Sequence, residues 1–133
     1  MTPEQVSLAA NWSTIVACIV AVFALVLGAR QFVETQKASR EYQAVELFLK
    51  FNQLNIEQAL SSNLESDHWY NNSKFAITES LFEIAHKSES WASTIRWMLE
   101  QQEDFIRSGN FDVETYTKRF RDFCENHNCE IRP

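Results

Sequence analysis

Residues 14–29 read TIVACIVAVFALVLGA, and no charged side chain lies between Glu4 and Arg30. This uncharged stretch spans about 25 residues, and an α-helix needs roughly 20 apolar residues to cross the hydrocarbon core of a bilayer. A buried helix of a soluble domain is seldom apolar on every face over such a length. A cleaved signal peptide has a basic N-terminal region and a small-residue cleavage site, and neither occurs here. The stretch therefore predicts a retained transmembrane helix.

The charges that flank this stretch predict its orientation. Arg30, Lys37 and Arg40 follow it, whereas Glu4 is the only charged side chain before it. Because lysine and arginine resist translocation, we expect the C-terminal side to remain in the cytoplasm. Trp12 is expected at the outer interface, where the amphipathic indole suits the headgroup layer.

Three segments follow from this topology. We expect residues 1–12 to form a short external tail, residues 13–33 to cross the lipid bilayer, and residues 34–133 to form a cytoplasmic helical bundle. The chain has 133 residues, so the part beyond the anchor has room for one small domain.

The composition favours an all-α fold. The chain has only two glycines and two prolines, and both prolines lie at its ends. Strands and their turns need more of both residue types. Residues 41–133 carry 16 acidic and nine basic side chains. Because this part of the chain is acidic, its overall field does not attract nucleic acid.

Four helices are expected along the chain. The first runs from about residue 5 to residue 60, because this range holds no proline and membrane helices tolerate its single glycine. The second follows a polar break at residues 61–68, is capped by Asn72 or Ser73, and ends near residue 87.

The third helix is expected to open at Ser88 or Ser90 and to stop at Gly109, and Asp112 is expected to cap the fourth. Their apolar residues and those of the second helix recur three or four apart, which predicts a buried face on each. The expected core comprises Phe75, Leu81, Phe82, Ile84, Ala85, Trp91, Ile95, Met98, Gln102, Phe105, Ile106, Val113, Tyr116, Phe120, Phe123 and Cys124.

One stripe of the first helix shows spacings that alternate between four and three residues. Its members beyond the span are Ala38, Tyr42, Val45, Leu49, Asn52, Ile56 and Ala59, and those within the span are Ala17, Ala21, Ala24 and Gly28. The alternation is typical of a left-handed helix–helix seam, and small residues let backbones approach in the bilayer. The stripe predicts a homo-oligomer. The alternative is that the domain's own helices cover it, because Phe48 and Phe51 widen the apolar face.

Few residues suggest a catalytic or metal-binding site. Cys124, His127 and Cys129 lie within six residues, but their spacing matches no common zinc pattern. We therefore expect no metal site and no cofactor, and interpret Cys124 as a core residue. His68 is expected in a loop at the edge of the bundle.

Residues 121–127 read RDFCENH, an R-D-x4-H pattern. It resembles the signature of HEPN domains, small four-helix bundles that often act as metal-independent ribonucleases. The resemblance implies that Arg121 stabilises phosphate charge, Asp122 orients the site and His127 transfers a proton. On an ideal helix Arg121 and His127 lie about 120° apart, so a shared substrate requires a distorted helix or a second chain. The non-catalytic alternative is an exposed arginine and a histidine that interacts with the helix dipole.

The layout of the whole chain also resembles a group of bacterial single-pass proteins. The residues that carry this likeness are Asn11-Trp12 before the span and the segment 29–32, Ala-Arg-Gln-Phe, after it. Some proteins of this layout are accessory proteins of type VI CRISPR and other antiphage systems, with a HEPN-like bundle on a membrane helix. The resemblance implies the bacterial inner membrane, with the N-terminus outside.

Three functions remain open. The first is a self-associating membrane protein that forms a pore or perturbs the membrane in antiphage defence, with an effector as a possible cytoplasmic partner. The second is a membrane-tethered HEPN-type ribonuclease, the only one in which RNA is a partner. The third is an accessory subunit of a larger membrane complex.

Overall fold

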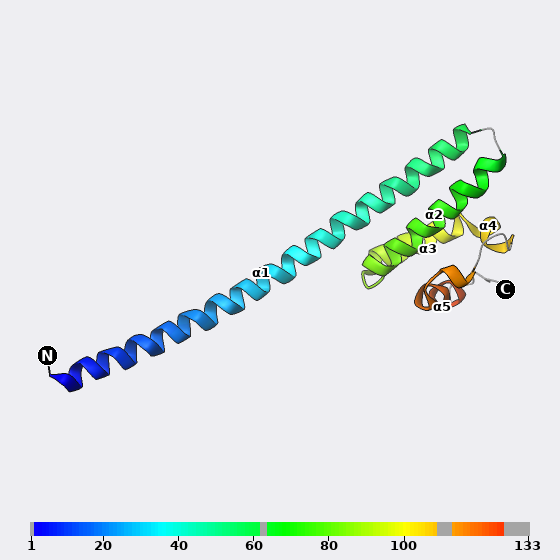
Figure 1. Ribbon diagram of the computed structural model, residues 1–133. Coiled ribbons are helices and arrows are strands. Elements are labelled where there is room, and N and C mark those ends of the chain that lie inside the picture. The colour runs from blue at the N-terminus through cyan, green and yellow to red at the C-terminus, as the bar shows by residue number, and fades with distance from the viewer. Residues whose placement is uncertain (1, 62–63, 109–112, 127–133) are drawn as a thin grey trace. The chain divides into compact units, whose positions relative to one another are not determined.

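The computed structural model describes residues 2–61, 64–108 and 113–126, and these residues form helices and connecting turns without a strand. The elements are α1 (Pro3–Leu60), α2 (Leu64–Ala85), α3 (Glu89–Glu100), α4 (Glu103–Arg107), the 3-10 helix η1 (Val113–Thr115) and α5 (Lys118–Asn126). Figure 1 labels the α-helices. The expectation of an all-α fold is confirmed for this part of the chain.

The chain divides into two compact units, Met1–Ser39 and Arg40–Pro133, and the boundary lies within the residue range of α1. Unit 1 is helical from Pro3, where a proline costs little because its missing N–H has no helical partner. The backbone N–H of Thr2 donates to Gln5 Oε1 at 3.1 Å, which is half of a capping box.

Unit 1 contains the predicted span. An 18-residue window of α1 has a mean hydropathy of 2.4, and none of this window is buried. A helix of this length and composition is able to cross a membrane. The large apolar side chains of this window are exposed and not buried in a core. Phe23 is 65% exposed and Leu25 is 74% exposed.

Unit 2 has a hydrophobic core of its own. The part of α1 within this unit buries Ala44, Phe51 and Leu54, and the half-buried Leu47 and Phe48 flank them. These positions recur three or four residues apart, so they lie on one face of the helix. The other core residues are Phe75, Ile77, Leu81, Phe82, Ile95, Met98, Leu99, Phe105, Ile106, Phe120 and Cys124.

Aromatic rings join α2 to α5. The Phe82 ring centroid lies 5.5 Å from that of Phe120 and 4.9 Å from that of Phe123. Phe75 contacts Phe120 at 5.3 Å and Tyr116 at 4.7 Å. A nine-residue helix is not stable alone in water, so α5 depends on this packing.

The expected third helix is two helices, because the chain turns at Gln101 and Gln102 between α3 and α4. The Gln102 side chain is 2% exposed, and its Nε2 donates to the Met98 carbonyl and to Thr78 Oγ1, both at 3.0 Å. Its backbone N–H bonds to the Leu99 carbonyl, a tighter i−3 bond that ends the α3 turn. The periodicity predicted burial at Gln102 but not the break.

α3 begins at Glu89 with Ser88 as its N-cap, as expected. The start of α2 differs from the expectation. α2 begins at Leu64, eight residues before Asn72, and Asn72 bonds back to the His68 carbonyl at 2.9 Å instead of capping the helix. The polar segment holds no glycine or proline to stop a helix, and Asp67 on α2 accepts from Gln58 of α1 at 3.0 Å. His68 therefore lies on α2 and not in a loop.

The fourth expected helix begins later. A 3-10 turn at Val113–Thr115 comes first, and α5 starts only at Lys118. Gly109 and the proposed cap Asp112 lie outside the described residues. Among the other expected core residues, Ile84, Ala85, Trp91, Tyr116 and Phe123 are half-buried.

Candidate functional site

The predicted stripe lies on a face of α1 that unit 2 leaves uncovered. Tyr42 is 73% exposed, Val45 42%, Leu49 61% and Ile56 63%. Leu60, one turn beyond Ile56, is 81% exposed. The half-buried Asn52 separates Leu49 from Ile56 in this stripe. A group of large exposed apolar side chains is unusual on a monomer and is typical of an interaction surface.

The unit's own helices pack against a different face of the same helix. Phe48 contacts the Trp91 and Trp97 rings, both at 6.3 Å between centroids, and Phe51 contacts Trp97 at 6.2 Å. Trp91 Nε1 donates to Glu41 Oε1 at 2.9 Å. The alternative that these helices cover the stripe is therefore wrong for Tyr42 and Leu49.

The small residues of the stripe in unit 1 are also uncovered. Ala17, Ala21, Ala24 and Gly28 are all exposed. A Cβ added to Gly28 meets no atom within 4 Å. No neighbour within the described part of the chain therefore requires a glycine at this position.

The structure describes only part of the R-D-x4-H pattern. Arg121 and Asp122 lie on α5, where Arg121 is half-buried and Asp122 is exposed. The Nε atom of Arg121 is buried without a hydrogen-bond partner among the described residues. His127 lies outside the described residues, so the catalytic pairing of Arg121 with His127 stays a prediction.

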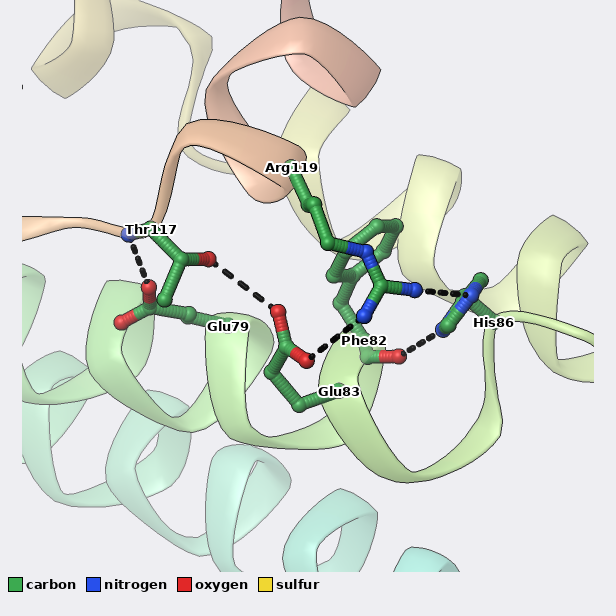
Figure 2. A network of polar contacts seen from close by, with 6 residues as sticks. All are labelled: Glu79, Phe82, Glu83, His86, Thr117 and Arg119. Atoms are coloured by element: carbon green, nitrogen blue, oxygen red, sulfur yellow. Dashed lines mark hydrogen bonds and ion pairs between the residues drawn. The ribbon is translucent and has the colours of Figure 1, made fainter.

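A polar network that the sequence did not suggest joins α2 to the start of α5 (Figure 2). The backbone N–H of Thr117 donates to Glu79 Oε1 at 2.6 Å, and Thr117 Oγ1 donates to Glu83 Oε1 at 3.1 Å. Arg119 Nη1 pairs with Glu83 Oε2 at 3.6 Å, and Arg119 Nη2 lies 3.0 Å from His86 Nε2. The bonded residues are 33 to 38 positions apart in the sequence, so no local sequence pattern predicts this network.

A second network surrounds Lys74 on α2. Lys74 is 5% exposed, and its Nζ donates to Gln58 Oε1 at 2.6 Å and to Asn55 Oδ1 at 3.0 Å, both on α1. Burial lowers the pKa of Lys74 from its ordinary value, and the nearby Asp67 carboxylate partly opposes this effect. The network ties α1 to α2 within unit 2.

No cluster of three or more metal-binding side chains occurs among the described residues. Cys124 is buried in the core, whereas His127 and Cys129 lie outside the part of the chain that the structure describes. His86 is engaged by Arg119 and by the Phe82 carbonyl, and the His68 ring bonds to Asn72 at 2.9 Å. Both described histidines therefore have protein partners.

No protein-family model, curated protein or solved structure matches this chain. The HEPN-like and CRISPR-accessory resemblances therefore stay predictions from the motifs alone. Among the described contacts, none joins Arg121 or Asp122 to a histidine.

Proposed function

We propose that this chain is a membrane-anchored, self-associating helical protein. The observation that carries the proposal is the uncovered stripe on α1, which includes Tyr42, Val45 and Leu49, at positions where the helices of unit 2 pack on another face. Burying such side chains against a second copy removes apolar surface from water, worth about 25 cal/mol per Å².

The anchor is supported by the apolar surface of unit 1. The side chains of residues 13–33 are exposed in the part of the chain that the structure describes, and a bilayer would cover them. The basic residues that follow the span favour a cytoplasmic location for unit 2. The bacterial inner membrane follows from the layout resemblance.

The spacing of the residues along α1 supports the seam. Tyr42, Leu49 and Ile56 take the a positions of a heptad, and Val45 and Asn52 take d positions. Within the span, Ala17, Ala21, Ala24 and Gly28 continue the same register with small side chains, which favour close helix packing in lipid.

The copies of this seam are parallel, because anchors inserted in one direction share their orientation. A parallel seam brings Glu41 at a g position toward Glu46 at the following e position of the next copy. Like charges repel, and salt screens them. Self-association is therefore expected to strengthen as ionic strength rises.

The layout resemblance supports a role for the assembly as a membrane-perturbing accessory in antiphage defence. No charged side chain lies between Glu4 and Arg30 to mark an ion path, so a conduit would form only between several copies.

The mass of the detergent-solubilised particle tests self-association. Leu49→Asp places a charge in the seam, and Gln43→Asp places the same charge on another exposed face of α1. We expect the wild type and Gln43→Asp to form homo-oligomers. Leu49→Asp should weaken association at least about tenfold, because an unpaired charge is costly to bury.

The span is tested with Ala21→Leu combined with Gly28→Leu, which should also reduce the particle mass. A monomeric wild type would overturn self-association. An oligomer that both Leu49→Asp and the leucine pair leave unchanged would overturn the seam. Co-purification with unrelated chains in place of copies would favour the accessory-subunit alternative.

A further inference from the structure

A single polar residue interrupts the apolar stripe of α1 within unit 2. Asn52 follows Leu49 by three residues and precedes Ile56 by four, so the three side chains lie on the same face of the helix. Leu49 and Ile56 are 61% and 63% exposed, and Asn52 is half-buried between them. A surface that covers Leu49 and Ile56 therefore covers the side chain of Asn52 as well.

The Asn52 amide has no side-chain hydrogen bond among the described residues. Its neighbours do, because Gln53 Nε2 donates to Glu57 Oε1 at 2.8 Å and Asn55 Oδ1 accepts from Lys74 Nζ at 3.0 Å. Water satisfies the Asn52 amide while the stripe is exposed. An amide that is buried without a partner costs free energy, because it gives up its bonds to water. Covering the stripe thus requires a polar partner at this one level of the helix.

A second copy of the chain supplies that partner in one alignment. Asn52 takes a d position, and in a parallel seam whose copies are in register each d residue faces the same residue of the next copy. A carboxamide has both donors and an acceptor, so two of them bond to each other. A shift by one heptad places Asn52 opposite Val45 or Ala59, whose side chains have no polar atom.

We propose that Asn52 fixes the register of the seam and makes α1 select its own copy as partner. This proposal rests on the self-association proposed above and names the contact that aligns the copies. A polar residue of this kind lowers the stability of an apolar seam and increases its specificity. The seam therefore tolerates leucine at position 52 in all copies and disfavours it in only some of them.

The test mixes two kinds of full-length chain in detergent. Wild type with one affinity tag and Asn52→Leu with another are equilibrated together, and capture on both tags in sequence measures the share of mixed particles. If leucine acts on each copy separately, its effect is additive and the copies mix at random. A bond between two amides is not additive, because a mixed particle buries the Asn52 amide against leucine. The equilibrium constant that forms mixed particles from like ones should therefore fall about tenfold below its random value.

Gln53→Leu is the matched control. Gln53 is the next residue along α1, is exposed and takes an e position. An e residue faces a g residue of the next copy and not its own counterpart, so this variant should mix with the wild type at random. Asn52→Ala removes the amide without adding a larger side chain. It should also mix below the random value, and it decides the matter if Asn52→Leu does not fold.

The outcomes separate this proposal from self-association itself. Asn52→Leu alone should still form oligomers, because leucine is favoured at a d position, and a folded but monomeric Asn52→Leu would overturn the register contact. An oligomeric wild type that mixes at random with both Asn52 variants would also overturn the contact and leave self-association intact. A monomeric wild type would overturn self-association and the role of Asn52 with it.

Discussion

Lys74 shows how a single side chain departs from its usual place on a surface. It is buried between α1 and α2, and its hydrogen-bond partners there are the neutral amide oxygens of Asn55 and Gln58. Its Nζ also lies 6.0 Å from the centroid of the Phe51 ring. Neutral partners satisfy the ammonium donors but do not offset the loss of hydration, so burial lowers the pKa of Lys74.

The lowered pKa predicts a pH-dependent stability. Between the folded pKa and the unfolded value of 10.5, the unfolded chain binds more protons at Lys74, so the free energy of unfolding rises with pH in this window. Lys74→Met should remove this rise and cost about 1–2 kcal/mol at pH 7 through two lost hydrogen bonds.

Denaturant unfolding followed by tryptophan fluorescence measures both effects of Lys74→Met. Lys50→Met, at an exposed position of α1, is the control and should retain the wild-type pH trend. A Lys74→Met variant whose stability follows the wild type across alkaline pH would contradict the assignment.

At the scale of elements, α5 depends on α2 for its position and for its first turn. The Thr117 N–H at the start of α5 bonds to the Glu79 carboxylate of α2, where a negative charge also suits the helix dipole. The network around Arg119 is shown in Figure 2. The rings of Phe120 and Phe123 complete the contact through Phe82.

We expect Glu79→Ala to destabilise the docking of α5 by about 1 kcal/mol, as the loss of a helix cap does. Glu79→Gln keeps an acceptor and should cost less. Hydrogen exchange of residues 118–126 at constant pH measures the change. Ser80→Ala, whose hydroxyl bonds only within α2 to the Ala76 carbonyl, should have no effect. Equal protection in Glu79→Ala and the wild type would show that this bond contributes nothing.

At the scale of the whole molecule, the two units have different physical requirements. None of the described apolar side chains of unit 1 is buried, whereas unit 2 buries a core drawn from α1, α2, α3, α4 and α5. A unit with its own core is able to fold alone, and an uncovered apolar helix of about 20 residues needs lipid.

A fragment of residues 40–133 should therefore be helical in buffer without detergent, as measured by circular dichroism. The full chain should remain with the membrane pellet after extraction with alkaline carbonate, whereas the fragment should stay in the supernatant. A full chain that carbonate releases would contradict the transmembrane prediction, and an unfolded fragment would contradict the independence of unit 2.

Much of the helical organisation was predictable from local pattern. The length of α1 followed from the absence of breakers, and the burial of Phe75, Ile95 and Met98 followed from spacings of three and four. The same spacing is the basis of the predicted stripe on α1. These features depend on neighbours within one helix, and the sequence lists those neighbours directly.

Tertiary packing decided the rest, because one helix offers several faces with similar spacing and its caps come from elsewhere in the chain. Only the packed structure shows that Phe51 faces inward while Leu49 stays exposed. The pairing of Arg119 with His86 and the cap from Glu79 join residues 33 to 38 positions apart. Such contacts depend on how helices meet in space, and no periodicity within a single helix specifies that.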